Sequence, residues 1–160
     1  MKSKLTRTNV VVIALAVLMA GFAPAAYADK CSTATVAGDW AFTLTGTLIL
    51  PTGGVPAAAI ARATADNAGN ITGTEARSVG GDYADETVVG NWTVNSDCTG
   101  TLTVNAYESG QLVRTSVVSI VFDDNSKEVR MVQKSLTLPD GTQLPVVITL
   151  EGRKQQGSEQ

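Results

Sequence analysis

The sequence predicts an all-β protein, and the architecture it favours is an antiparallel, eight-stranded up-and-down β-barrel. One observation is the alternation of apolar and hydroxyl-bearing residues over Gly38–Leu50, the two-residue period of a strand with one buried face. Another is a series of strand-like runs separated by short clusters of turn-forming residues. A third is that no segment after the N-terminal leader has a helical apolar repeat. A β-sandwich is the alternative architecture.

Residues 1–28 have the features of a signal peptide. Basic residues precede an uncharged apolar run from Val10 to Phe22, and Ala26-Tyr27-Ala28 has the small residues of a cleavage site. The run is too short for a stable transmembrane helix, so we expect a secreted or periplasmic protein with no membrane insertion after cleavage. The barrel domain is then expected over residues 29–152, with a flexible tail over 153–160.

Charge and cysteine content narrow the functional classes. Cleavage would remove three of the 12 basic residues and none of the 15 acidic ones, which leaves a net charge of −6. Such a chain should repel nucleic acid.

Export also favours a disulfide between Cys31 and Cys98, which would constrain the unfolded chain by about 4 kcal/mol in the entropic treatment. The chain has no histidine, so we predict no metal ligands and no imidazole-dependent catalytic residues.

The alanine-rich run after the first strand is the most ambiguous element. We predict a strand over Ala57–Ala65, because large apolar residues with a 3.6-residue spacing are absent from it. Asp66–Asn70 behind it is typical of a hairpin turn. A further strand is expected over Ile71–Val79, followed by an acidic loop over Gly80–Glu86.

The clearest hairpin turns near Cys98. A turn centred on this residue pairs Trp92 with Val104 and Val94 with Leu102, which places both apolar sets on one face.

The last three predicted strands complete the set of eight. They cover Leu112–Phe122, Glu128–Leu138 and Gln143–Leu150, with a hairpin signal at Pro139-Asp140-Gly141 before the last. Consecutive antiparallel strands with short connections usually lie side by side. Closure into a barrel then removes both edges of the sheet, which is why we favour it over a sandwich.

Two short motifs resemble the opening of known barrel families. Gly38-Asp39-Trp40 resembles the Gly-x-Trp that begins the barrel of lipocalins and other calycins. The preceding cysteine and the later Asn70-Ile71-Thr72-Gly73-Thr74 are similar to the opening of avidin-like barrels. The resemblance implies a small secreted barrel that holds a hydrophobic molecule or biotin at one mouth. We identify neither the biotin ligands of avidins nor the C-terminal helix of lipocalins.

The residues on the inward-facing parity are candidates for a pocket wall. We expect five of them to form it: Trp40, Phe42, Leu44, Trp92 and Val94. The favoured interpretation of the two indoles is nevertheless a plug that closes one end of the core, because an eight-stranded barrel is just wide enough for side chains to fill.

The charged residues within the predicted strands include Arg62, Glu75, Arg77 and Arg114. If they point inward they need partners and could anchor the polar end of a ligand. The favoured interpretation is that they are solvated charges on the outer face, where they discourage edge pairing.

Three functional hypotheses follow from these features. The first is an exported β-barrel that binds a small hydrophobic ligand and needs no cofactor. The second is a cyclase or isomerase similar to those with allene-oxide-cyclase-like barrels, which would act mainly by shaping the substrate. The third is a structural or surface-interaction protein whose barrel is filled by side chains.

Overall fold

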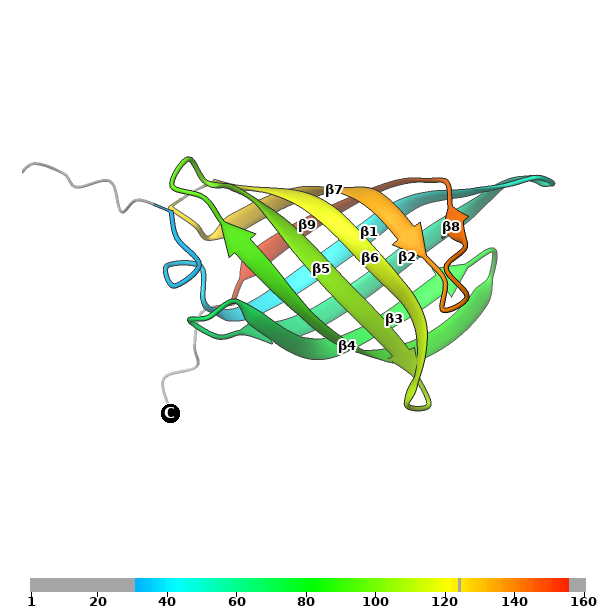
Figure 1. Ribbon diagram of the computed structural model, residues 1–160, viewed down its shortest axis with the longest axis horizontal. Helices are drawn as coiled ribbons and strands as arrows, with labels where there is room; N and C mark the ends of the chain where they lie inside the picture. Colours follow the sequence, from blue (N-terminus) through cyan, green and yellow to red (C-terminus); the bar gives the residue numbers. More distant parts are fainter. Residues whose placement is uncertain (1–30, 124, 156–160) are drawn as a thin grey trace, which may run out of the picture.

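The computed structural model describes residues 31–123 and 125–155, so the predicted signal peptide lies outside the described residues. The described chain forms nine strands around one interior (Figure 1). They are β1 (Gly38–Leu50), β2 (Gly53–Ala65), β3 (Asn70–Val79), β4 (Asp82–Val94), β5 (Thr99–Glu108), β6 (Gln111–Asp123), β7 (Glu128–Thr137), β8 (Gln143–Leu144) and β9 (Val146–Lys154). Within these residues we find no helix with the length and hydropathy needed to span a bilayer.

Eight of the strands close into a barrel. Strands β1 to β7 each pair antiparallel with the next along the chain, and β9 then joins β7 back to β1. The two-residue β8 is an extra strand that pairs with β7 alone among the nine. The predicted antiparallel, eight-stranded up-and-down barrel is therefore confirmed, and the sandwich alternative is wrong.

The alanine-rich segment is a strand, as predicted, and its small side chains make room for larger ones. Trp40 of β1 lies opposite Ala63, and Leu44 lies opposite Ala59. Both alanines are buried, because the odd-numbered positions of β2 face the interior. Pairing a large side chain on one strand with a methyl group on its neighbour lets the β1 residues reach across the narrow interior.

The hairpin between β4 and β5 differs from its predicted register. Trp92 pairs with Leu102 rather than Val104, and Val94 pairs with Gly100. The turn centres one residue before Cys98, because Cys98 itself adopts a left-handed conformation (φ 67°) at the end of a three-residue loop. Each partner moves by two residues, which preserves the inward face of both strands.

The acidic loop predicted over Gly80–Glu86 is wrong. Gly80 and Gly81 both have positive φ, at 60° and 91°, and make a two-residue turn. Positive φ at both central positions is the geometry that glycine permits and that matches the twist of a hairpin. Strand β4 consequently begins at Asp82, so that Glu86 is a strand residue.

The predicted last strand is interrupted by Pro145. This residue has no N–H to donate to the ladder, and it separates β8 from β9. Its carbonyl instead accepts a hydrogen bond of 2.8 Å from the amide of Ile49. Strand β9 then continues to Lys154, two residues beyond the expected end of the barrel domain.

Aromatic side chains fill the half of the barrel nearest the N-terminal segment. We call Trp40, Phe42, Trp92 and Phe122 the aromatic plug. Phe122 packs edge to face on both indoles, with ring centroids 5.7 Å from Trp40 and 5.3 Å from Trp92. Both indoles are 1% exposed. The interpretation of the indoles as a plug is therefore confirmed.

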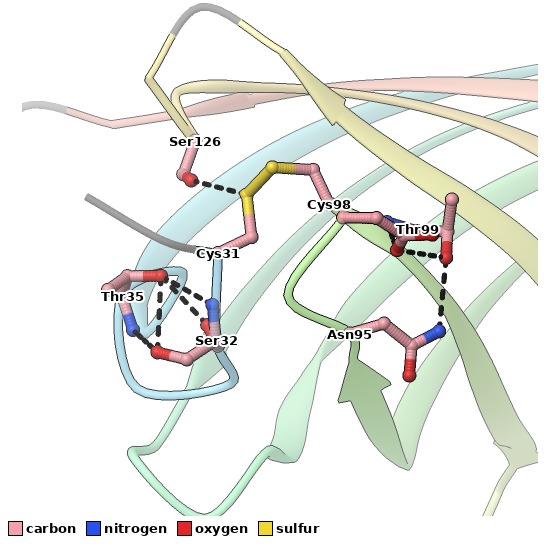
Figure 2. Close-up of a disulfide and its surroundings, with 8 residues drawn as sticks. Cys31, Ser32, Thr35, Asn95, Cys98, Thr99 and Ser126 are labelled. Atoms are coloured by element: carbon pink, nitrogen blue, oxygen red, sulfur yellow. Dashed lines mark hydrogen bonds between the residues drawn. A yellow bond between two sulfur atoms is a disulfide. The ribbon is translucent and has the colours of Figure 1, made fainter. Parts of the chain in front are cut away.

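A disulfide fastens the N-terminal segment across this closed end. Cys31 and Cys98 are bonded, as predicted, with Cα atoms 4.9 Å apart (Figure 2). The bond brings the chain just before β1 to the β4–β5 turn. Val36, which follows in the same segment, is fully buried against the plug. Disulfides of this kind are typical of proteins in oxidising compartments.

Candidate functional site

The other half of the barrel contains a cavity of about 280 Å³. Its wall is mostly aliphatic and comes from strands around the whole barrel; the wall includes Leu44, Leu48, Ala59, Val104, Leu136 and Ile148. Asp82 also lines the cavity, and its side chain is 80% exposed, so the cavity reaches solvent at this end. The barrel is thus closed at one end by the aromatic plug and hollow toward the other.

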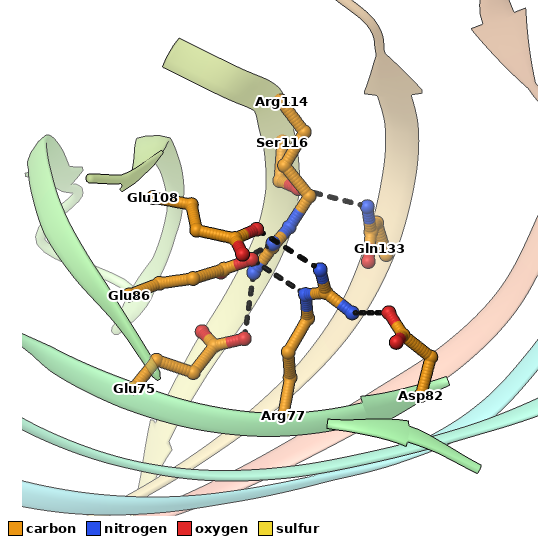
Figure 3. Close-up of polar contacts among 8 residues, drawn as sticks. All are labelled: Glu75, Arg77, Asp82, Glu86, Glu108, Arg114, Ser116 and Gln133. Carbon is orange, nitrogen blue, oxygen red and sulfur yellow. Dashed lines mark hydrogen bonds and ion pairs between the residues drawn. The ribbon is translucent and has the colours of Figure 1, made fainter. Parts of the chain in front are cut away.

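Six charged side chains form a connected group beside this cavity (Figure 3), and all of them except Glu108 line it. We call the six members the carboxylate–arginine cluster: Glu75, Arg77, Asp82, Glu86, Glu108 and Arg114. Both guanidinium groups converge on the carboxylate of Glu86 (Figure 3). Arg77 Nε donates to one of its oxygens at 2.6 Å, and an Arg114 terminal nitrogen donates to the other at 2.5 Å.

The strand register explains why the cluster needs its arginines. Glu75 on β3 lies directly opposite Glu86 on β4, and like charges in that position destabilise a sheet. Arg114 bridges the two carboxylates, since its other terminal nitrogen donates to Glu75 Oε1 at 2.6 Å. Arg114 comes from β6, two strands along the sheet from β4, so the curvature of the sheet brings the compensating charge to the two acids.

Burial divides the cluster into a shielded part and a rim. The side chain of Glu86 is fully buried, and those of Glu75, Arg77 and Arg114 are 11% to 18% exposed. Asp82 and Glu108, in contrast, are 80% and 45% exposed, and each lies 3.4 Å from Arg77. The shielded part contains two cations and two acids, which is the balance that buried charges require.

Glu75 is a shielded acid whose surroundings favour its neutral form. Burial raises the pKa of its carboxyl; the Arg114 cation opposes the rise, and the Glu86 anion adds to it. Burial alone would lower the pKa of Arg77, but the hydrogen bond and charge of Glu86 outweigh it and raise the pKa overall. Arg77 therefore stays charged, whereas burial favours the protonated form of Glu75.

An uncharged amide extends the polar lining beside Arg114. Gln133, on β7, is 8% exposed and lines the cavity. Its amide nitrogen donates to Ser116 Oγ at 3.0 Å and to the carbonyl of Ser135 at 3.1 Å. Both amide hydrogens are used in this way, whereas Oε1 accepts no hydrogen bond from residues 31–123 and 125–155. The described residues hold no group of three or more acids and cysteines placed to bind a metal ion.

The structure places the five predicted wall residues in two different surroundings. Leu44 lines the cavity. Trp40 and Trp92 belong to the hydrophobic core around the plug, and Phe42 and Val94 pack against that core. The aromatic part of the predicted wall thus lies toward the closed end, and the cavity lining itself is aliphatic.

The favoured outer-face interpretation of the strand charges holds for one residue and is wrong for three. Arg62 is exposed on the outside of β2. Glu75 and Arg77 share the inward parity of Ile71 on β3, and Arg114 shares that of Val118 and Ile120 on β6. In the sequence, the parity that the three charged residues share with these apolar neighbours indicates that their side chains point inward.

The sequence did not point to Glu86, Glu108 or Gln133 as site residues. Glu86 shares its parity with Val88 and Trp92, a signal that was hidden by its assignment to a loop. For Gln133, the two-residue alternation with Val129 and Met131 was a sufficient indication. Glu108 is the last residue of β5, so no apolar strand residue follows it to indicate an inward face.

The chain matches no known protein-family model and no curated protein at a significant level.

Proposed function

We propose that this protein is an exported β-barrel that binds a small, mostly apolar molecule in its cavity. The observation that carries the proposal is the aliphatic cavity of about 280 Å³ with a polar cluster on one side. A cavity of about 150 Å³ holds benzene, so this one fits a ligand of about ten to twelve non-hydrogen atoms. Export is supported by the Cys31–Cys98 disulfide.

The division of the interior supports a binder over a filled structural barrel. Side chains fill the plug half, where both indoles are buried. The cavity half instead presents small or aliphatic groups around a space that reaches solvent. Ligand sites commonly combine such a mainly apolar wall with a few convergent polar groups.

A cavity-blocking variant tests this proposal. Ala59 is an inward, 7% exposed residue of the cavity wall, so Ala59→Phe should fill the space. The matched control is Thr103→Phe, which adds a ring to the outer face of β5. We expect a lipophilic fluorescent probe to bind saturably to the wild type and to the control. Its affinity for Ala59→Phe should be weaker by about tenfold or more. Equal affinity in all three proteins, or no saturable binding, would refute the proposal.

Native mass spectrometry gives an independent test on the protein from its own host. A retained small molecule would appear as added mass of a size that the cavity admits. The same measurement on Ala59→Phe should show the protein without that mass, whereas a contaminant bound elsewhere would persist.

A cyclase or isomerase is the second candidate, and one observation favours it. Glu75 combines a raised pKa with a position on the cavity wall, which is the environment of a proton-transfer group. Glu75→Gln separates the two candidates. If the protein is a binder, the wild type and Glu75→Gln should retain the same molecule. If it is an enzyme, the wild type should retain the product and Glu75→Gln should retain the substrate. Chromatography of the extracted ligand would distinguish them even if they are isomers.

A further inference from the structure

The carboxylate–arginine cluster contains more acid than base. Four carboxylates face two guanidinium groups, so the cluster carries a charge of −2 when all are ionised, and −1 when Glu75 is neutral. Both arginines already have carboxylate partners. Arg77 contacts three acids and Arg114 contacts two. An incoming anion would compete with these carboxylates for the guanidinium groups and would add to an excess of negative charge.

Two uncommitted positions on this wall are hydrogen-bond acceptors. Gln133 Oε1 lines the cavity and accepts nothing from the described residues. Glu75 is similar, since Arg114 engages its Oε1 and no described residue donates to its second oxygen. Neither oxygen belongs to the fully buried side-chain atoms that lack a partner among the described residues, so a donor on a ligand can reach both. The two acceptors come from different strands and lie on the same cavity wall as Arg114.

We propose that the polar end of the ligand is a hydrogen-bond donor without negative charge. It is an alcohol, whose single O–H donates to Glu75 or Gln133, or a primary amine, which has enough N–H groups to donate to both. The site discriminates against carboxylates such as fatty acids, although its two arginines suggest the opposite at first sight. The inference rests on the ligand-binding function proposed above and names the class of molecule that this function takes.

Three probes with the same nine-carbon chain isolate the head group. Nonan-1-ol and nonylamine have about ten non-hydrogen atoms, which suits the cavity, and nonanoate is their anionic counterpart. Titration calorimetry at neutral pH and about 0.15 M salt limits long-range surface electrostatics. We expect the alcohol and the amine to bind at least about tenfold more tightly than nonanoate. The neutral alcohol is the decisive probe, because the overall charge of the protein does not attract it.

Two rim acids allow the charge argument to be tested while all four shielded side chains are kept. Asp82→Asn/Glu108→Gln brings the fully ionised cluster from −2 to 0 at exposed positions. The matched control is Asp85→Asn/Glu151→Gln, which removes two charges from exposed positions on the outer face. We expect nonanoate affinity to rise by about threefold or more in the rim variant and to stay unchanged in the control.

The outcomes separate this inference from the function on which it rests. Nonanoate binding that equals or exceeds alcohol binding would overturn the inference and leave the binding function standing. An equal rise of nonanoate affinity in the rim and control variants would also overturn it, since it would assign the discrimination to overall charge. If none of the three probes binds, the binding function fails and the inference fails with it.

Discussion

Trp40 and Trp92 pack edge to face in the aromatic plug, with ring centroids 5.7 Å apart and planes at 89°. Their indole N–H groups nevertheless differ in hydrogen bonding. Trp40 Nε1 donates to the carbonyl of Val36 at 2.9 Å. Trp92 Nε1 is buried and has no acceptor among the described residues. The two rings thus bury similar area, and only one of them ties the N-terminal segment to the barrel.

This difference predicts unequal costs for the same substitution. Trp40→Phe leaves the Val36 carbonyl without its donor, whereas Trp92→Phe removes an N–H that was already unpaired. We expect Trp40→Phe to lower the free energy of unfolding by about 1–2 kcal/mol more than Trp92→Phe. Urea unfolding of both variants measures the difference. Equal losses, or a larger loss in Trp92→Phe, would contradict it.

Glu86 and Glu108 predict a second contrast, between a shielded and a rim carboxylate. Glu86 is fully buried and holds two guanidinium groups, so Glu86→Gln leaves both cations short of a counter-charge. We expect a loss of about 3–5 kcal/mol of unfolding free energy, the usual consequence of breaking a buried pair. Glu108 is 45% exposed, and Glu108→Gln should cost less than about 1 kcal/mol.

Urea unfolding of Glu86→Gln and Glu108→Gln measures the two losses of unfolding free energy. A third variant, Glu151→Gln on the exposed outer face of β9, shows how much any acid-to-amide change costs. If Glu86→Gln costs no more than the rim variant, the shielded charges do not hold β3, β4 and β6 together as their geometry indicates.

The barrel was predictable from local patterns, whereas the contents of its interior were only partly so. The alternation over Gly38–Leu50 and the short turns suffice for an up-and-down barrel. The partner of Glu75 did not follow from local sequence, because Arg114 lies 39 residues away and meets it only when the sheet curves between β3 and β6. An isolated strand charge without a visible partner is more often solvated, which is why the outer-face interpretation was favoured.

Composition misled the prediction at the start of β4. Asp82, Asp85 and Glu86 follow two glycines, and a run rich in glycine and acids is typical of a loop. The two left-handed glycines make the shortest hairpin turn instead, which returns the acids to the strand. The alternation of Ala84, Glu86 and Val88 carries the correct signal, and with the turn shortened it would have placed Glu86 inside.

The left-handed conformation of Cys98 predicts how its replacement should behave. Its φ of 67° is unfavourable for a residue with a Cβ and free of that cost for glycine. In a chain already lacking Cys31, Cys31→Ala/Cys98→Gly should therefore be about 1 kcal/mol more stable than Cys31→Ala/Cys98→Ala. Both should lie about 2–5 kcal/mol below the wild type, because the cross-link is lost. Thermal or urea unfolding under matched conditions ranks the three proteins, and an alanine variant as stable as the glycine variant would show that the turn relaxes without the disulfide.

Glu75 predicts the direction of a pH dependence of stability. Its pKa is raised by burial in the folded protein, with Arg114, Glu86 and Arg77 as the charged neighbours that face it. Between its unfolded and folded pKa values the folded state binds more protons than the unfolded state, so stability falls as pH rises through that window. The contribution is fully present below about pH 4.5, the ordinary value, and is lost as pH rises through the folded pKa.

Comparison with Glu75→Gln isolates this contribution, because the amide cannot titrate. The free energy of unfolding of the wild type minus that of the variant should decrease from pH 4 toward neutral pH and then level off. The neighbouring carboxylates remain in both proteins, so their titration largely cancels in the difference. A difference that stays flat would mean that Arg114 fully compensates the burial of Glu75, and a difference that increases with pH would mean that the arginine holds the pKa below its ordinary value.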